Sequence, residues 1–399
     1  MIESGLILIA TLLVFTVGKS PVFRVDRAGA AIIGASLIVG LHVLSFEQAI
    51  QAVDHRTIVV LFSMMVILAN LKLAGFFEMV GGYLLGTVSS QGQLLLAIIF
   101  ISGLFSALCI NDIVCLLFTP IVLLICRQIQ CNPIPYLLAV AMASNIGSAA
   151  TLIGNPQNIL ISSLSGLNFI SYFIVAAPMT LFGLLLCYVT IGYCYRKDLQ
   201  KKLQPFSRDV NYTYHRYLII KSLLTMTAVV MAFAVGLDIA IASSLGAAYL
   251  LITRRVNPNK IYTSVDFNLL VMFVGLFVIV GGVEHSGLMG WLIGKLDFVD
   301  FSNYGVFTTL TIILSNIVSN VPAILLLKFF VPSHNPSLWW TQMAIFTTLA
   351  GNLTITGSFA NLIVVETAKR HGITIGFWDY LKVGFPLTVI ICTFGFLLL

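Results

Sequence analysis

Two short segments carry side chains suited to binding ions, and each lies inside an otherwise apolar stretch. The first is SNIGSAATLIGNPQN, residues 144–158, and the second is GNLTITGSFAN, residues 351–361. In both, an Asn lies four residues after a Gly and another Asn lies upstream: Gly154, Asn158 and Asn145 in the first, Gly357, Asn361 and Asn352 in the second. Neutral side-chain oxygens suit sodium ions or protons, and the N-termini of interrupted helices suit anions. The pair therefore predicts a site for small ions.

The first segment also predicts a break in a helix. Pro156 supplies no backbone N–H, and the residue before it, Asn155, is disfavoured in the helical conformation. In hydrocarbon, a broken helix leaves backbone polar groups without partners, so a break persists only where it faces a binding site or a cavity. Two matched, interrupted hydrophobic segments are typical of the substrate site of a secondary transporter.

Asp112 is the one carboxylate deep in an apolar run of the first half of the chain. An acid at mid-membrane costs about 2.5–3.5 kcal/mol on insertion scales, so we expect it to face protein or water. It lies at the tip of a predicted hairpin, where it either binds a cation or proton or caps the following helix. The equivalent position in the second half is Val321, within Ser319-Asn320-Val321, so the two hairpins differ chemically.

The candidate ion-binding and substrate-binding residues lie beside the two breaks and at the two hairpin tips. They are Asn111, Asp112, Ser144, Asn145, Ser148, Thr151, Gly154, Asn155, Asn158, Ser319, Asn320, Asn352, Thr354, Thr356, Gly357, Ser358 and Asn361. Bridging between membrane helices is the alternative role, and for any single Ser or Thr it is the favoured one. We expect no catalytic residue, no metal site and no cofactor other than a coupling sodium ion or proton.

The composition predicts a polytopic membrane protein. Of 399 residues, 59% are hydrophobic and 9% are charged, against roughly 25% charged in a soluble domain, and the mean hydropathy is +1.03. The net charge of +6 does not indicate a nucleic-acid partner, because the basic residues lie in short connectors, as membrane topology requires. The seven cysteines lie mostly in apolar runs without C-x-x-C spacing, which favours buried thiols over disulfides or a metal site.

The order of apolar segments divides the chain into two similar halves. In residues 1–195 we expect crossings near 6–17, 28–44, 57–73 and 170–195, a hairpin at 94–126 and an interrupted crossing at 136–164. A basic linker, residues 196–216, precedes residues 217–399, where crossings near 218–235, 239–253, 269–282 and from 377 accompany a hairpin at 304–331 and an interrupted crossing at 343–368. Each half would comprise a scaffold (1–90, 217–302) and a transport part (91–195, 303–399).

Sequence offsets support an internal repeat. Residues 53–76 align with residues 265–288 with six identities in 24 positions, including Asp54 with Asp266. Further along, Asn111 aligns with Asn320 at an offset of 209, and Asn158 with Asn361 at 203. Five crossings per half is an odd number, so the repeats should be inverted. The fold class expected is an all-α polytopic membrane protein of two inverted repeats, each with a re-entrant hairpin and a broken helix.

The distribution of charge agrees with this topology. If both termini are outside and the central linker is cytoplasmic, 18 of the 21 Lys and Arg residues fall on the inner side, leaving Arg56, Lys295 and Lys328 outside. Positive-inside sorting predicts such a bias. We therefore expect a multi-pass protein of the plasma membrane, such as a bacterial inner membrane.

Five motifs carry a family resemblance: SALCINDIVCLLFTP, SNIGSAATLIGNPQNIL, VDFNLLVMFVGLFVIVGGVEHSGL, SNIVSNVPA and GNLTITGSFANLIVVETAKRHG. They resemble the ion transporter superfamily, most closely its arsenite/anion permease and citrate-transporter-like branch and more distantly the divalent-anion sodium symporters. The resemblance implies a homodimeric elevator carrier with a moving transport domain on a dimerising scaffold. Its ion and substrate sites would be lined by Asn111, Asp112, residues 145–158, Ser319, Asn320 and residues 352–361. The symporters' Ser-Asn-Thr hairpin signature is replaced by Ile110-Asn111-Asp112 and Ser319-Asn320-Val321.

The function expected is secondary active transport of a small inorganic or organic anion, coupled to sodium or protons. The alternatives are a cation/proton antiporter of the same architecture, an arsenite efflux permease and, less favoured, an intramembrane enzyme or a channel. No phosphate-binding G-x-x-x-x-G-K-[ST] loop, H-E-x-x-H motif or nucleophile elbow occurs in the sequence, which argues against ATP use and against an enzyme. The expected partners are the anion, membrane lipid and a second copy of the chain.

Overall fold

The structure is a computed structural model that describes residues 1–18, 23–200, 214–253, 256–296 and 299–399. The described residues form helices and no β-strand, which confirms the all-α class. The helices of the first half are α1 (Ile2–Val17), α2 (Arg27–Gly40), α3 (Phe46–Ala52), α4 (His55–Leu73), α5 (Phe76–Thr87), α6 (Gln91–Leu108), α7 (Asn111–Gln128), α8 (Ile134–Ser148), α9 (Pro156–Ser165), α10 (Phe169–Cys194) and α11 (Arg196–Leu199).

The second half repeats the order of α1–α10, with two added 3₁₀ turns and, among the described residues, without a counterpart of α11. Its elements are α12 (Arg216–Ala234), α13 (Ile239–Leu251), α14 (Pro258–Tyr262), α15 (Phe267–His285), α16 (Leu288–Lys295), α17 (Tyr304–Val318), α18 (Asn320–Leu327), η1 (Lys328–Phe330), α19 (Pro336–Ala350), η2 (Ile355–Gly357), α20 (Phe359–Arg370) and α21 (Phe377–Leu398). Most of the predicted linker, residues 201–213, lies outside the described residues.

Seven described helices are long and apolar enough to cross a membrane: α4, α6, α7, α10, α12, α15 and α21. Shorter apolar helices accompany them, among them α1, α2, α8, α13 and α17. Four of them are short for reasons visible in the sequence: charged N-cap residues, Asp26 and Asp238, start α2 and α13, the first predicted break ends α8, and the second hairpin tip ends α17. The polytopic prediction is therefore confirmed.

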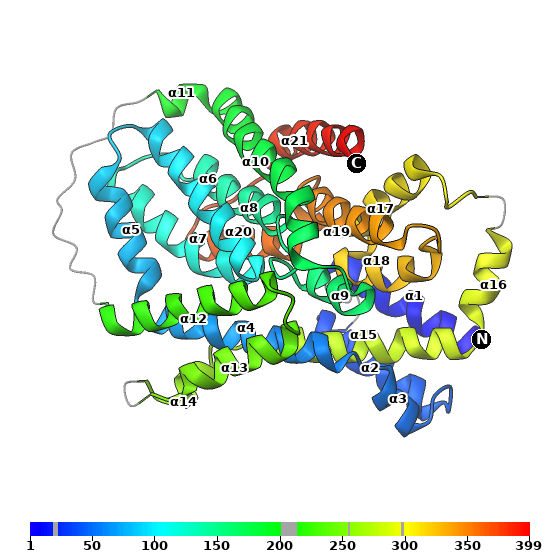
Figure 1. Cartoon of the computed structure of the whole chain (residues 1–399). Coiled ribbons are helices and arrows are strands. Elements are labelled where there is room, and N and C mark those ends of the chain that lie inside the picture. The colour runs from blue at the N-terminus through cyan, green and yellow to red at the C-terminus, as the bar shows by residue number, and fades with distance from the viewer. Residues whose placement is uncertain (19–22, 201–213, 254–255, 297–298) are drawn as a thin grey trace.

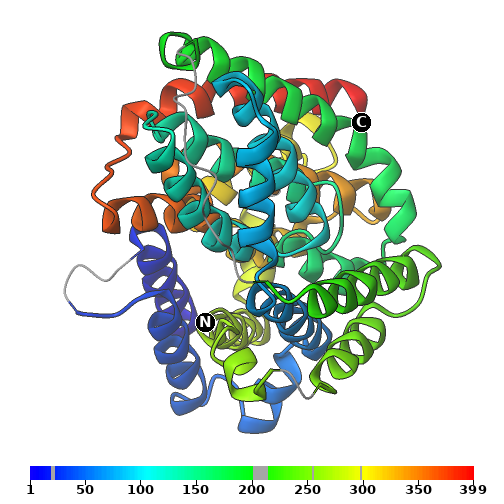
Figure 2. The ribbon, with the colours of Figure 1, turned by 90° about the vertical axis from the view of Figure 1, so that its left-hand side faces the viewer.

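The helices lie in two layers (Figures 1 and 2). In Figure 1 the lower layer contains α1, α2, α4, α12, α13 and α15, and α6, α7, α8, α10, α19 and α21 lie above it. In the lower layer α2 packs against α15 and α4 packs against α13; in the upper layer α6 packs against α8, α7 against α20 and α10 against α21. The sequence assigns the lower helices to the scaffold and the upper ones to the transport part, and that functional division stays a prediction.

The interruptions occur where Gly, Asn, Ser and Pro predict them. Helix α6 ends at Leu108 and α7 begins at Asn111, while α17 ends at Val318 and α18 begins at Asn320. The broken helices are α8–α9, interrupted over residues 149–155, and α19–α20, interrupted over residues 351–358. Every residue of 144–158 is buried. The first break therefore lies inside the protein and not in a surface loop.

The repeat extends to local structure. Asp54 and Asp266, aligned by sequence, both cap a helix by accepting hydrogen bonds from backbone N–H groups, at the starts of α4 and α15. Gly75 and Gly287 both precede a short helix with φ of 77° and 74°. The packing of α2 on α15 corresponds to that of α13 on α4. These matches support two copies of one unit, and their opposite orientation in the membrane stays a prediction.

Close packing of α6 on α8 depends on a glycine pair. A Cβ atom added to Gly147 would lie within 3 Å of the backbone O, Cα and C atoms of Gly103. Small residues permit this approach between membrane helices. We expect Gly147→Ala to lower the free energy of unfolding by about 1–3 kcal/mol, as overpacking of a core does, measured by thermal unfolding in detergent. Gly192→Ala on α10 is the matched control, since nothing lies within 4 Å of its added Cβ; equal stability of the two variants would contradict the expectation.

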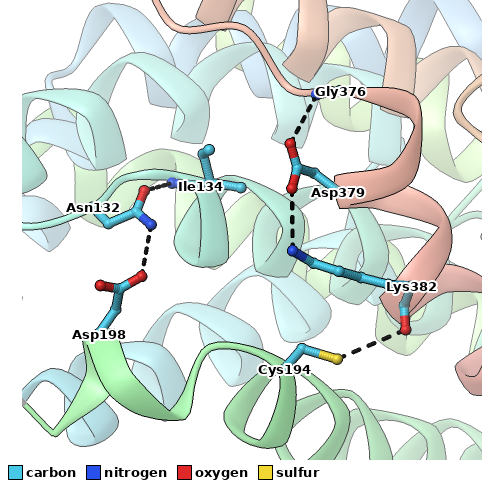
Figure 3. Close-up of polar contacts among 7 residues, drawn as sticks. All are labelled: Asn132, Ile134, Cys194, Asp198, Gly376, Asp379 and Lys382. Atoms are coloured by element: carbon cyan, nitrogen blue, oxygen red, sulfur yellow. Dashed lines mark hydrogen bonds and ion pairs between the residues drawn. The ribbon is translucent and has the colours of Figure 1, made fainter.

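A polar cluster joins the end of the first half to the last helix (Figure 3). Asn132 Nδ2 donates to Asp198 Oδ2 on α11 at 2.8 Å. On α21, Lys382 Nζ pairs with Asp379 Oδ1 at 3.1 Å, and the Lys382 carbonyl accepts a hydrogen bond from Cys194 Sγ at 3.7 Å. The residues in these contacts lie close to helix ends, and none of these residues lines the cavity described below. We assign the cluster a structural role.

Candidate ion and substrate site

The hairpin tips and the restarting ends of the broken helices surround one cavity of about 220 Å³. From the upper layer it is lined by Asp112, Asn155, Pro156, Gln157, Ser319, Asn320, Val321, Pro322, Ser358, Phe359 and Leu362. From the lower layer it is lined by Phe15, Gly18, Asp26, Arg27, Ala28, Asp266, Asn268, Leu269 and Met272. The cavity therefore lies between the layers, and both halves of the chain contribute to it.

Four helices, α7, α9, α18 and α20, begin at this cavity, and none has a side-chain cap. The N-cap residues of the last three are Asn155, Ser319 and Ser358, types that usually accept a hydrogen bond from the first turn. Ser358 Oγ instead donates to Asn145 Oδ1 at 2.9 Å, and Asn155 Nδ2 donates to Ser148 Oγ at 3.3 Å. In α7 the Asn111 N–H is bonded to the Gly154 carbonyl, whereas first-turn N–H groups of α9, α18 and α20, such as that of Gln157 in α9, remain able to bind an anion.

Asn145 joins the two halves behind the cavity. Its Nδ2 donates to Asn352 Oδ1 at 2.9 Å and to Asn361 Oδ1 at 3.0 Å. Its Oδ1 accepts from Asn111 Nδ2 and from Ser358 Oγ, both at 2.9 Å. All five side chains are buried. Because every hydrogen-bonding position of the Asn145 amide is used, this residue holds the breaks together and has no free group for a ligand.

The two broken helices are closed by the same hydrogen bonds. Asn158 Nδ2 donates to the carbonyls of Ser148 (3.2 Å) and Thr151 (3.0 Å). Asn361 Nδ2 donates to the carbonyls ten and seven residues before it, those of Gly351 (2.8 Å) and Thr354 (3.1 Å). The paired Asn residues therefore satisfy carbonyl groups that the breaks release from helical bonding.

The hairpin tips pack against the breaks. The Asn111 N–H donates to the Gly154 carbonyl at 2.9 Å, and Thr151 Oγ1 donates to the Ala107 carbonyl at 2.5 Å. In the second half Asn316 Nδ2 donates to the Ala350 carbonyl at 3.0 Å. A Cβ on Gly154 would lie 2.5 Å from the Ser148 carbonyl oxygen. The close approach of these two backbone segments therefore requires glycine at position 154.

Three buried amide oxygens at these tips have no hydrogen-bond partner among the described residues: Asn111 Oδ1, Asn316 Oδ1 and Asn320 Oδ1. A buried carbonyl oxygen without a partner costs roughly 1–3 kcal/mol. Such oxygens are ligands that a hard cation accepts. Their position at the tips suits a site for a coupling cation.

The cavity contains opposite charges. Asp112 on α7 and Arg27 at the start of α2 are each 9% exposed, and they interact electrostatically. Arg27 Nε donates to the Phe15 carbonyl at 3.1 Å, and its guanidinium lies 5.7 Å from the centre of the Phe359 ring. Asp266, the N-cap residue of α15, also acts on Asp112, as a like charge. The site thus combines four helix N-termini, one buried cation, one buried carboxylate and the partly exposed carboxylate of Asp266.

The structure brings most of the predicted residues together. Asp112, Asn155, Ser319, Asn320 and Ser358 line the cavity. Behind it, hydrogen bonds or close contacts join Asn111, Asn145, Ser148, Thr151, Gly154, Asn158, Asn352, Gly357 and Asn361. Ser144 Oγ lies 2.8 Å from Cys115 Sγ, and Thr354 and Thr356 contact each other in the more exposed part of the second break. Their roles in binding stay predictions.

The sequence interpretation missed Arg27, Asp266 and Asn316. It placed Arg27 in a solvated inner connector, whereas the structure buries it against the cavity. The preceding residue, Asp26, caps α2 by accepting a hydrogen bond from the Gly29 N–H at 2.8 Å. The sequence feature that could have indicated a buried arginine was an Asp-Arg pair at the start of an apolar run. Asp266 was noted only for its place in the repeat, and Asn316 aligns with Ala107, so the repeat gave no sign of it.

A helical membrane bundle in which two broken helices and two hairpins meet at one buried polar cavity is the architecture of a secondary transporter. Residues 10–350 match the family described as citrate transporter, and the chain belongs to that family. It is accordingly a multi-pass membrane transporter, of a family of transporters and not of enzymes.

Curated relatives match over nearly the full length. The 46 kDa membrane protein of Mycobacterium leprae is 29% identical over 92% of both chains. The silicon efflux transporter LSI3 of rice (Oryza sativa subsp. japonica) is 28% identical, with 94% of this chain and 92% of its own covered. The putative transporter arsB of Dictyostelium discoideum is 25% identical, with 93% and 86% covered. These names place the chain among arsenite- and citrate-permease-like transporters.

A solved structure has a similar fold. The chain aligns with the crystal structure of the YdaH transporter of Alcanivorax borkumensis with a TM-score of 0.58, covering 99% of this chain and 97% of that one. Sequence identity is 14%, so the likeness concerns the fold alone.

Proposed function

We propose that the protein is a secondary active transporter of a small anion, either an inorganic oxyanion or a carboxylate. The observation that supports this most strongly is the convergence of four uncapped helix N-termini and Arg27 on one cavity. Each N-terminus presents partial positive charge, the first turns of α9, α18 and α20 keep N–H groups for a ligand, and an arginine adds a full charge with planar donors. The names of the family and of its relatives, citrate, silicon and arsB, favour ligands of this size and oxygen-rich chemistry.

We propose that the coupling ion, sodium or a proton, binds at the hairpin tips. Asp112 supplies the carboxylate, and the unpartnered oxygens of Asn111, Asn316 and Asn320 supply neutral ligands. A cation there offsets the charge of Asp112 and fills unused hydrogen-bonding capacity. Anion and cation would then cross together or in exchange.

Alternating access would follow an elevator mechanism in a homodimer of the plasma membrane. The lower-layer residues that line the cavity lie at the end of α1 and the starts of α2 and α15. The charge distribution assigns all three ends to the cytoplasmic side. With both termini outside and the central linker cytoplasmic, as we propose, the cavity would open to the cytoplasm.

Ligand-dependent thermal unfolding of the purified protein tests the proposal. Citrate, phosphate and arsenate are compared with the neutral hydroxides arsenite and silicic acid, each with sodium, with potassium and across pH. We expect at least one anion to stabilise the protein, by about 2.7 kcal/mol when its concentration is 100 times Kd, and more so with the coupling ion. Stabilisation by the neutral hydroxides alone would support a metalloid efflux permease instead.

A cation/proton antiporter is the second candidate, because Asp112 and Asp266 place two carboxylates at one cavity. Stabilisation by sodium or by a change of pH, without an effect of any anion, would favour it over anion transport.

A further inference from the structure

We propose that Arg27 couples the two ligands: an anion that binds its guanidinium takes up the positive charge that offsets Asp112, so that Asp112 then binds the coupling cation. This inference rests on the proposed function and deepens it: it names the residue through which the two ligands are coupled. Arg27 has no counterpart in the second half, where Ile239 occupies the aligned position after the cap residue Asp238. The residue is therefore a feature of this cavity and not of the repeat.

The position of the guanidinium is fixed from two sides. Its Nε donates to the Phe15 carbonyl at the end of α1 (3.1 Å), and the group lies over the ring of Phe359, the first residue of α20 (5.7 Å). It is thereby held next to the uncapped N-terminus of the second broken helix. An anion bound to the N–H groups of that first turn lies within reach of the guanidinium, which suits bidentate recognition of a carboxylate or oxyanion.

Three carboxylates share the cavity with Arg27, and two of them have another role. Asp26 Oδ1 accepts from Gly29 N at 2.8 Å and Asp266 Oδ1 accepts from Leu269 N at 3.1 Å, so both cap their own helices. No described residue donates a hydrogen bond to Asp112, which interacts with Arg27 only through the electrostatic field. Asp112 is therefore the carboxylate whose negative charge depends on Arg27 for stabilisation.

Because Asp112 and the anion both depend on the positive charge of Arg27, binding of the anion is coupled to binding of the cation. Without an anion, the positive charge of Arg27 partly offsets the negative charge of Asp112 within the same cavity, although the two side chains form no ion pair. When an anion binds the guanidinium, Asp112 is left uncompensated in a poorly solvated place, which is costly unless a cation joins it. Each ligand therefore raises the affinity for the other, and the enhancement must be reciprocal.

The two partners also lie in different layers. Helix α2 packs against α1 and α15, whereas α7 packs against α8 and α20. If the upper layer moves as the elevator model requires, Arg27 stays behind. The coupling through Arg27 would then operate only at the end of the movement where Asp112 and the bound anion lie beside this residue.

Binding measurements on the full-length protein test the inference. Calorimetric titrations with citrate, phosphate and arsenate are made at low and high sodium and at two pH values, for the wild type, Arg27→Gln and Arg27→Lys. We expect the best wild-type anion to bind about tenfold or more tightly when the coupling cation is present, and Arg27→Gln to weaken anion binding about tenfold or more. In Arg27→Gln, the cation should no longer change the affinity for the anion. Arg27→Lys, which keeps the charge, should retain part of the coupling.

Arg56→Gln is the matched control, because Arg56 is exposed and pairs with Asp238 outside the cavity; its binding should equal that of the wild type. Wild-type anion binding with undiminished cation coupling in Arg27→Gln would overturn the inference and leave the proposed function standing. If Arg27→Gln does not fold, full wild-type affinity and coupling in Arg27→Lys would overturn it as well, since a lysine cannot reproduce bidentate contact. Failure of the wild type to bind any of the three anions would refute the proposed function itself.

Discussion

Replacing Asn145 by Ala should destabilise the protein by about 4 kcal/mol or more and abolish transport. The substitution removes four buried hydrogen bonds that join Asn145 to Asn111, Asn352, Ser358 and Asn361. Each buried polar group left without a partner costs about 1–3 kcal/mol, and the partners belong to both halves of the chain. The loss should therefore affect both breaks and the first hairpin tip together.

Thermal unfolding in detergent measures the stability of this variant, and uptake into proteoliposomes measures its transport. Asn70→Ala is the matched control: Asn70 is also buried, but its amide makes a single local bond to the Val66 carbonyl at 2.9 Å. We expect the control to lose no more than about 1–2 kcal/mol and to keep its activity. Equal loss in the two variants would show that the amide network does not join the halves.

The second large effect is expected for Asp112→Asn. The variant keeps the size of the side chain and removes its charge, so the coupling cation loses the one carboxylate at the tip of the first hairpin. A partner to a charged group contributes about 1.5–3 kcal/mol, so gradient-driven accumulation of the anion should fall by roughly 10- to 100-fold. Exchange of labelled for unlabelled anion without a gradient should continue, because the helix N-termini and Arg27 remain.

Proteoliposomes with an imposed sodium or proton gradient measure the effect. Glu366→Gln on α20 is the control, since Glu366 is exposed and lies 3.9 Å from Arg370 on the same helix; it should accumulate anion like the wild type. Accumulation by Asp112→Asn at the wild-type level would contradict the assignment of Asp112 to the coupling ion.

The breaks could be predicted from sequence because their causes are local. Pro156 lacks an N–H, Asn155 is disfavoured as helix before it, and the structure restarts α9 at Pro156. The same reasoning placed Asn158 and Asn361 in equivalent roles, which their matching hydrogen bonds support. Local rules and the repeat together located the hairpin tips and both broken helices.

The rest depended on tertiary packing. Arg27 looks like any topology-setting arginine until α2 packs on α15 and its N-terminus faces α20. Thr354 and Thr356 match the composition of the first break, yet Thr356 faces outward, because a loop's composition does not fix which side faces the cavity. Asn145 was predicted as a binding residue, and only the three-dimensional arrangement shows that all its hydrogen-bonding groups are already used.

The most direct test is a cryo-EM map of the protein in lipid nanodiscs, saturated with the anion that stabilises it best. The proposed function predicts density for the anion in the cavity, at hydrogen-bonding distance from the first turns of α9 and α20 and beside Arg27. A saturated map in which this cavity holds no anion, or in which the anion lies away from both broken helices, would contradict it.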